Sequence, residues 1–143
     1  MSKAKLNPIS TIQLIELPKI NSDCQGLLTP IYGRSHVPFA INRIYYIYDI
    51  PHGSKRGAHA HRNLQQLLIA ISGSFEVIVK DGYDEKSFVL NNPAQGLYIP
   101  SMIWRELINF TDGTVCLSLA SLPFDENDYI RDYNEYLNII FSR

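Results

Sequence analysis

The sequence contains the nonapeptide GSKRGAHAH at residues 53–61, followed by Gln66 and then Gly73. Successive side chains of an extended strand project to opposite faces, so residues two apart share a face. His59 and His61 are therefore predicted to point together into whatever the strand covers. Two imidazoles would then lie within reach of one small molecule.

A second segment, PSMIWRELIN at residues 100–109, has a spacing that complements the first. Together the two segments resemble the paired signature motifs of the cupin β-barrels. The departures fall at the metal ligands, since Gln66 stands where a ligand glutamate is usual and Arg105 occupies the place of the last ligand histidine. Glycines of the second motif are replaced by Ala94 and Met102. The resemblance implies an all-β fold, a cupin or jelly-roll β-barrel.

These substitutions argue against a metal ion in the predicted cavity. A guanidinium stays protonated at any working pH, has no lone pair to donate and repels a cation, so Arg105 is not a ligand. His59 and His61 alone fall short of the three protein ligands that a catalytic zinc site typically keeps. We therefore expect neither a metal nor another cofactor.

The composition fits a single domain spanning residues 1–143. Of these 143 residues, 45% are hydrophobic, which is enough for one sizeable core. The net charge of −1, without a basic block or an acidic tail, argues against nucleic acid and membrane surfaces as main partners. Met1–Lys5 is not followed by an apolar segment of signal-peptide length, and two cysteines do not make a disulfide framework. We expect a cytoplasmic protein.

Short β-type runs recur between turn signals, as in an antiparallel sandwich or barrel. Asp81-Gly82 is a strong hairpin signal, and Ser72-Gly73 is a second one. The expected strands are Thr11–Leu17, Leu27–Tyr32, Arg43–Ile50, Gly57–Arg62, Gln65–Ile71, Ser74–Lys80, Lys86–Leu90, Leu97–Ile99, Ile103–Phe110 and Thr114–Ala120.

Only the tail of the chain departs from the β pattern. Asp125 or Asn127 could cap a helix there. The apolar residues that recur at helical spacing are Tyr129, Tyr133, Leu137 and Ile140. We expect this short C-terminal helix to pack its apolar face on the barrel.

The strand pattern does not decide which tyrosine lines the cavity, because both faces of the expected strand Arg43–Ile50 carry aromatic side chains. If the cupin register holds, Arg105 faces inward with the two histidines. Two imidazoles, a fixed cation and one or more phenols can remove a proton from carbon and stabilise the negative oxygen that results. The inventory predicts a proton-transfer site.

Four segments together resemble the sugar 3,4-ketoisomerases, small cupins that act on dTDP-4-keto-6-deoxyglucose in the pathways to 3-amino-3,6-dideoxyhexoses. They are RIYYI at residues 43–47, RGAHAH at 56–61, GLYIP at 96–100 followed by Trp104, and DENDYIRDY at 125–133. The resemblance covers nearly the whole chain. It implies a metal-free jelly-roll barrel that forms a homodimer, with exchange of N-terminal strands between the protomers.

The resemblance also implies roles for the candidate residues. A ketone at C4 acidifies the C3 hydrogen, which a neutral histidine can remove while the C4 oxygen is stabilised. His61 is the expected principal base, with His59 in support and Tyr46 as the proton donor. Arg105 would polarise or orient the hexose, and with Tyr32 it resembles the pair found in enzymes that give gluco products. The other residues expected to bind the dTDP-linked sugar are Arg43, Arg56, Tyr48 and Gln66.

Three alternatives stay open at this point. A dTDP-sugar 3,5-epimerase would share the proton abstraction, but such enzymes pair a histidine with a carboxylate, and no Asp or Glu lies beside the His-x-His in the sequence. A non-catalytic sugar-nucleotide-binding cupin would tolerate the loss of a histidine with little change beyond affinity. A metal-dependent cupin would lose its activity to a chelator.

Overall fold

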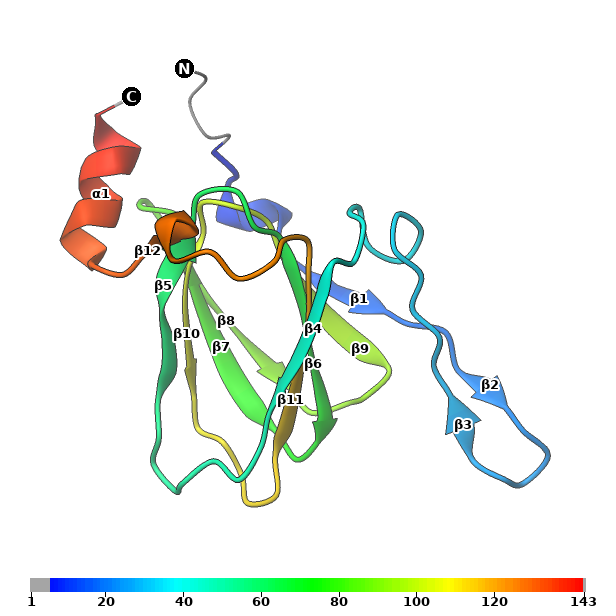
Figure 1. Ribbon diagram of the computed structural model, residues 1–143. Helices are drawn as coiled ribbons and strands as arrows, with labels where there is room; N and C mark the ends of the chain where they lie inside the picture. Colours follow the sequence, from blue (N-terminus) through cyan, green and yellow to red (C-terminus); the bar gives the residue numbers. More distant parts are fainter. Residues whose placement is uncertain (1–5, 143) are drawn as a thin grey trace.

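Two antiparallel five-stranded sheets pack face to face in the computed structural model, which describes residues 6–142 (Figure 1). The first sheet has the strand order β1 (Leu14–Glu16), β9 (Gln95–Ile99), β6 (Gln66–Ser72), β11 (Val115–Ala120) and β4 (Arg43–Ile47). The second has the order β12 (Tyr129–Ile130), β5 (Arg56–His61), β10 (Trp104–Ile108), β7 (Phe75–Lys80) and β8 (Glu85–Leu90). The other elements are the 3₁₀ helices η1 (Ile9–Thr11) and η2 (Glu126–Asp128), the strands β2 (Ile20–Asn21) and β3 (Leu27–Leu28), and helix α1 (Tyr133–Phe141). The expected all-β barrel with a short C-terminal helix is confirmed.

Met1–Lys5, the start of the chain on which the expected absence of a signal peptide was based, lies outside the described residues, as does Arg143. Within residues 6–142, no helix combines the length and the apolarity that a membrane crossing needs. That residues 1–143 form a single domain stays a prediction.

The core lies between the sheets, because their strands present alternate apolar side chains to each other. In β7, Phe75, Val77 and Val79 are almost fully buried, while the residues between them are half-buried. Leu68 of β6 and Leu107 of β10 belong to the same apolar cluster. Burying one such side chain stabilises the fold by about 1.5–3 kcal/mol. The packed core therefore holds the two sheets in a fixed relation and gives rigid walls to any cavity between them.

Several strands are shorter than the sequence pattern predicts. The expected strand Arg43–Ile50 ends before Asp49, whose φ of 52° is a left-handed conformation that breaks the ladder. The expected strand Leu27–Tyr32 contracts to Leu27–Leu28, because Pro30 has no N–H to donate to a ladder. Its partner β2 is absent from the sequence prediction, and the two form a hairpin that projects from the barrel (Figure 1).

The C-terminal helix begins later than the sequence pattern predicts. Tyr129 lies in β12, where it pairs with His61 of β5, and not in a helix. Asp125 caps only the short η2, by accepting a hydrogen bond from the Asn127 backbone N–H. Helix α1 begins instead after Asp132, whose carboxylate accepts hydrogen bonds from backbone N–H groups of its first turn.

Helix α1 packs on the second sheet, as expected. Its buried residues Tyr136 and Ile140 contact Trp104 and Met102. The Tyr136 hydroxyl donates a hydrogen bond to the Met102 carbonyl at 2.9 Å. These contacts anchor the tail against β5 and β10, and β12 is held beside β5 as a result.

Candidate active site

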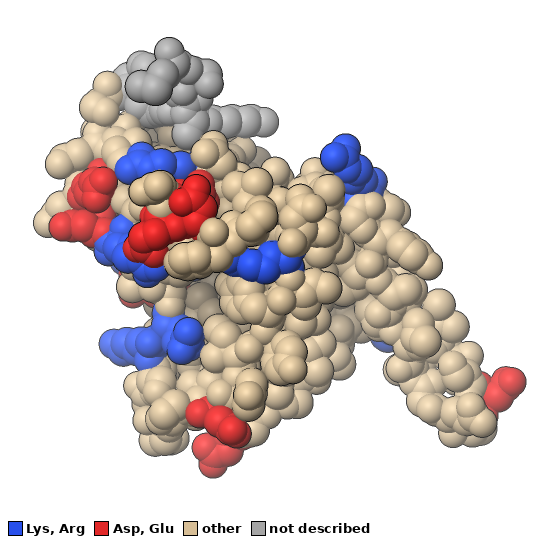
Figure 2. Space-filling view, in the orientation of Figure 1, with Lys and Arg blue, Asp and Glu red and all other residues tan. Residues whose placement is uncertain are grey.

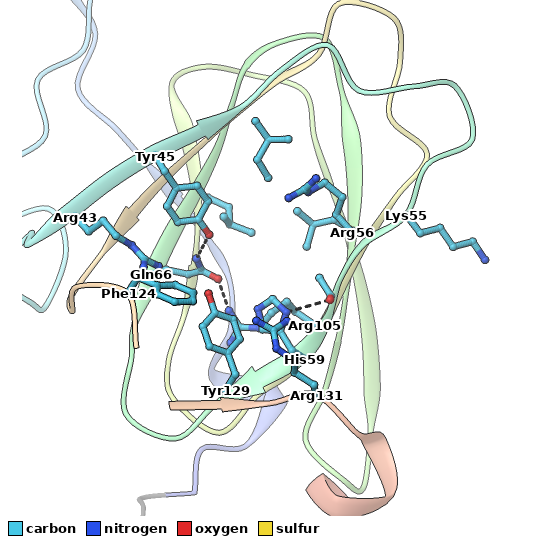
Figure 3. A pocket seen from close by; sticks show the side chains of 14 residues that line it. Arg43, Tyr45, Lys55, Arg56, His59, Gln66, Arg105, Phe124, Tyr129 and Arg131 are labelled. Atoms are coloured by element: carbon cyan, nitrogen blue, oxygen red, sulfur yellow. Dashed lines mark hydrogen bonds between the residues drawn. The ribbon is translucent and has the colours of Figure 1, made fainter. Parts of the chain in front are cut away.

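An open cavity of about 520 Å³ lies between the sheets, with walls from β4, β5, β6, β10 and β12 (Figure 3). Figure 2 shows Lys and Arg side chains on both sides of a hollow in this face. Within residues 6–142, the cavity lining includes five cationic side chains and no acidic one. The cationic residues are Arg43, Lys55, Arg56, Arg105 and Arg131. The cavity therefore favours an anionic ligand.

A bulge in β5 positions His59 on the cavity wall. Gly57 and Ala58 have φ values of 82° and 55°, and the pairing of β5 with β10 shifts register at Arg105 and Glu106. A Cβ at Gly57 would lie 3.0 Å from the Arg105 carbonyl, so both the φ and the close approach require glycine. The Gly57 carbonyl accepts a hydrogen bond from Nδ1 of His59 at 3.0 Å. The proton of the neutral ring is thus on Nδ1, and Nε2 keeps a lone pair.

His61, two residues further on, is held from behind by the C-terminal segment. His61 is 1% exposed, and its Nδ1 lies 3.0 Å from Oδ2 of Asp128. The Asp128 carboxylate also accepts hydrogen bonds from the backbone N–H groups of Asn63 at 2.7 Å and Leu64 at 3.2 Å. His61 is not among the residues that line the cavity, whereas His59 is. The two rings meet edge to face, with centroids 4.9 Å apart.

Both histidines are neutral near pH 7. Burial, reinforced by the positive charge of Arg105, lowers the pKa of His59 to about 3. Burial also lowers the pKa of His61 to about 4, although the hydrogen bond to Asp128 acts in the opposite direction. Burial raises the pKa of Asp128, but the hydrogen bonds that it accepts from His61 and from the backbone outweigh this, so the net shift is downward. His61 and Asp128 therefore pair as a neutral imidazole and a charged carboxylate.

Arg105 brings a fixed positive charge to the floor of the cavity. It is almost fully buried; burial lowers its pKa to about 10, so it remains protonated at neutral pH. It donates to Oε1 of Gln66 through Nη1 and to the Ile103 carbonyl through Nε and Nη2. Gln66 in turn donates through Nε2 to the Tyr45 hydroxyl at 3.2 Å and to Oγ of Ser118 at 2.9 Å. Figure 3 shows the resulting chain from Arg105 through Gln66 to Tyr45.

The structure places Tyr45, and not the expected Tyr46, on the cavity wall. Tyr45 lines the cavity, whereas Tyr46 is 61% exposed on the other face of β4 and its ring lies beside that of Tyr48. Tyr48 is equally exposed and is likewise absent from the cavity. Tyr32 stacks on His36 outside the cavity. The expected residues that one chain does bring together are His59, Arg43, Arg56, Arg105 and Gln66, with His61 directly behind them.

The C-terminal segment also contributes to the site, which the sequence pattern did not predict. The Tyr129 ring lies 4.9 Å from the His59 ring and 4.4 Å from the His61 ring, centroid to centroid. Arg131 lies over Tyr129 and forms an ion pair with Glu126, and Phe124 completes this wall. The motif DYIRDY at residues 128–133 was the signal, but its helical spacing concealed the strand that pairs with β5.

Asp128 also overturns one argument made from the sequence. A carboxylate does lie beside the His-x-His, because Asp128, which is 67 residues away in the chain, contacts His61. The absence of a neighbouring acidic residue in the sequence is therefore no argument against a 3,5-epimerase. The distinction between the two reactions has to come from other observations.

The residues present give a metal ion little to bind. Within residues 6–142, no three His, Cys, Asp or Glu side chains converge as a metal site requires. Gln66, at the place of the usual ligand glutamate, is engaged by Arg105. The guanidinium next to His59 would repel a cation.

The chain matches a protein family, a characterised relative and several solved structures. Residues 10–140 match the protein family described as FdtA: WxcM-like, C-terminal. The chain is 40% identical over 118 residues to the TDP-4-oxo-6-deoxy-α-D-glucose-3,4-oxoisomerase of Aneurinibacillus thermoaerophilus. That match covers 82% of this chain and 85% of the relative.

Two solved structures are similar along most of the chain. One is a His-to-Asn variant of QdtA, the 3,4-ketoisomerase of Thermoanaerobacterium thermosaccharolyticum, in complex with TDP-4-keto-6-deoxyglucose. Its TM-score is 0.89 at 41% identity, over 95% of this chain and 98% of QdtA. The other is WlaRB, the TDP-quinovose 3,4-ketoisomerase of Campylobacter jejuni, with a TM-score of 0.86 at 42% identity, over 91% of this chain and 99% of WlaRB.

Proposed function

The chain belongs to the family described as FdtA: WxcM-like, C-terminal, and from this membership we propose that it is a 3,4-ketoisomerase of TDP-4-keto-6-deoxyglucose. Relatives that share 40–42% of its residues carry this activity in their names. The observation in the chain itself that carries the proposal is the His59 imidazole. Its proton is fixed on Nδ1 by the Gly57 carbonyl, in a cationic cavity next to Arg105.

The cationic rim suits the diphosphate of a nucleotide sugar. Arg43, Lys55, Arg56 and Arg131 all line the cavity, and charge-assisted hydrogen bonds to phosphate oxygens are among the strongest that side chains make. Nε of Arg43 is a buried donor without a hydrogen-bond partner in residues 6–142, so this guanidinium is not committed to another side chain. Phe124 gives an aromatic face against which a thymine ring could stack.

His59 is the base of the proposed reaction. The C4 ketone acidifies the C3 hydrogen, and Nε2 of His59 takes that proton as the electron pair moves to the C4 oxygen. The fixed charge of the buried Arg105 stabilises the enediolate. The roles expected from the sequence are thereby exchanged, since His59 lines the cavity and His61 lies behind it.

Tyr45 takes the place of Tyr46 as the proposed proton donor. Its hydroxyl accepts a hydrogen bond from Gln66 and so keeps its own proton for the substrate. Because Gln66 is polarised by Arg105, the chain of hydrogen bonds makes this phenol a better donor. Tyr45 gives a proton to the C4 oxygen and recovers one from the C3 hydroxyl. A proton then returns to C4, from His59 on the same ring face for a galacto product, or from solvent on the opposite face for a gluco product while His59 releases its own proton to solvent. The ketone ends at C3 and all atoms balance.

The proposal is tested by incubating the protein with TDP-4-keto-6-deoxyglucose in heavy water, with and without a chelator, and following the sugar hydrogens by NMR. We expect deuterium exchange at C3 and a 3-keto product, neither affected by the chelator. His59→Asn should abolish exchange while the Kd for TDP changes less than about twofold. His52→Asn, at an exposed histidine outside the cavity, is the matched control.

The other outcomes each refute the proposal in a different way. Exchange at both C3 and C5, with the ketone left at C4, would identify a 3,5-epimerase. Binding of TDP without exchange at any carbon would identify a binding domain. Loss of turnover on addition of the chelator would identify a metal-dependent enzyme.

We propose a homodimer as the working assembly. β4 is an edge strand of the first sheet. Ile44 and Tyr46 on its outer face, and Tyr48 just after it, are each more than half exposed. Leu27 and Leu28 of the projecting β2–β3 hairpin are also more than half exposed. Exposed edges and apolar patches of this kind are usually covered in native proteins. Exchange of the β2–β3 hairpins between two copies would cover both the outer face of β4 and the hairpin itself. A monomeric mass in light scattering would contradict the proposed homodimer.

The gluco configuration at C4 and the cytoplasmic location stay predictions. Arg105 lines the cavity, but Tyr32 is 64% exposed and lies outside it, so one chain alone does not assemble the pair on which the configuration was predicted. The coupling constants of the C4 hydrogen in the product would decide between the gluco and galacto forms.

A further inference from the structure

Asp128 is the buried carboxylate closest to the proposed reaction, yet it does not line the cavity. It is 6% exposed and accepts three hydrogen bonds, one of them from Nδ1 of His61. The pairing of β12 with β5 places it there, because Tyr129, the next residue, lies directly opposite His61 in the ladder. The contact is therefore fixed by backbone pairing and not only by side-chain conformation.

We propose that Asp128 is a positioning residue that holds the proton of His61 on Nδ1 and leaves Nε2 unprotonated. This inference rests on the proposed ketoisomerase function and extends it. A carboxylate can only accept, so the ring nitrogen that faces Asp128 must donate. Which nitrogen of a histidine carries the proton is set by the partner of the other nitrogen.

Nε2 of His61 is free to act once Nδ1 is fixed. Within residues 6–142, the one fully enclosed side-chain nitrogen or oxygen without a hydrogen-bond partner is Nε of Arg43. Nε2 of His61 has no partner in the same part of the chain, so it is not fully enclosed and borders open space. The ring it belongs to lies 4.9 Å from the His59 ring. A second unprotonated ring nitrogen is thus held on the histidine beside His59.

Asp128 also supplies the charge that the cavity lacks. All five ionic side chains of the cavity lining are cationic, and the proton taken from C3 would add a positive charge to His59. The carboxylate of Asp128 lies on the far side of the His61 ring, which it contacts at 3.0 Å. In a buried site, a negative charge at this range favours the protonated form of His61, the ring beside His59. Its effect is therefore expected in kcat and not in the binding of TDP.

The decisive substitution is Asp128→Asn, which keeps the shape of the side chain. An amide that presents its NH₂ to Nδ1 would force the proton of His61 to Nε2. We expect two-bond ¹⁵N–¹H spectra of the ligand-free protein to show an Nδ1–H tautomer for His61 in the wild type. In the variant, we expect the Nε2–H tautomer to dominate.

Activity is measured on the same variants. Asp128→Asn should lower kcat by about 10-fold or more with little change in KM, but by less than the ~10⁴-fold lost when an aspartate orients the catalytic base itself, because His61 lies behind the base His59. Asp125→Asn, the same exchange in the same segment but at a residue that caps only η2, is the matched control. If Asp128 acts through His61, the double variant Asp128→Asn/His61→Asn should be no slower than His61→Asn alone.

Several results would overturn the inference. An Nε2–H tautomer of His61 in the wild type would do so even if the variant failed to fold. An unchanged tautomer in Asp128→Asn, an unchanged kcat, or losses that multiply in the double variant would each show that Asp128 only stabilises the turn at Asn63 and Leu64. The tautomer is determined without substrate. A wild type with the Nδ1–H tautomer but no isomerase activity would therefore refute the proposed function and not the role of Asp128 on His61.

Discussion

The neighbours Tyr45 and Tyr46 offer the sharpest test of the site, because one β-strand carries their side chains to opposite faces. Tyr45→Phe removes the hydroxyl that faces the cavity and accepts from Gln66 at 3.2 Å. Loss of a proton donor costs about 10²- to 10⁴-fold in kcat. Tyr46→Phe removes a hydroxyl from the outer face and should leave kcat within about twofold of the wild type.

The cost of Tyr45→Phe in stability should be small. Gln66 keeps its second acceptor, Oγ of Ser118 at 2.9 Å, so only one neutral hydrogen bond is lost. A neutral hydrogen bond contributes about 0.5–1.5 kcal/mol to the free energy of unfolding. Urea unfolding therefore separates a folding defect from a catalytic one.

Steady-state conversion of TDP-4-keto-6-deoxyglucose at saturating substrate, followed by NMR, is the assay of choice for this pair. A Tyr45→Phe variant that retains kcat within about threefold of the wild type would refute the role of this phenol. A Tyr46→Phe variant that alone loses activity would restore the assignment expected from the sequence.

Two further predictions follow from the same geometry. His59 and His61 have pKa values of about 3 and 4 in the fold against 6.5 ordinarily, so between pH 6.5 and pH 4 the unfolded chain binds more protons. The free energy of unfolding should then fall, as the pH falls, by up to about 1.4 kcal/mol per pH unit for each histidine. In His59→Asn it should fall less steeply. Urea unfolding at several pH values measures this slope, and equal slopes in the wild type and the variant would contradict the prediction. Gly57→Ala should destabilise the fold by about 1–2 kcal/mol, since its φ is 82°, and should also lower kcat by displacing His59. An alanine variant with normal stability and activity would show that the bulge does not position the ring.

The spacing within residues 53–61 and residues 100–109 was sufficient to predict the barrel and much of the site. The alternation of β5 brings His59 and His61 to one side, and Gln66 and Arg105 meet there across 39 residues of sequence. The period of two in a strand is a local property, so it survives folding unchanged.

The tyrosines and the C-terminal segment could not be assigned in the same way. Tyr45 and Tyr46 are equivalent by pattern until the sheet shows which face meets the core. Asp128 and Tyr129 share their spacing with helix α1, and only the pairing of β12 with β5 reveals that they lie beside the histidines. Long-range strand pairing is a tertiary property, and the helical period of the segment outweighed it in the sequence pattern.

The position of β12 near the end of the chain has a consequence for biosynthesis. Nine of the ten strands in the two sheets, and both strands of the projecting hairpin, are complete by Ala120, but Asp128 and Tyr129 leave the ribosome only after them. Domains generally fold as units once their chain is available, and contacts between distant residues form late. A nascent chain could thus close most of its barrel and still lack the carboxylate behind His61, so an enzyme truncated before η2 would be folded in large part and catalytically immature.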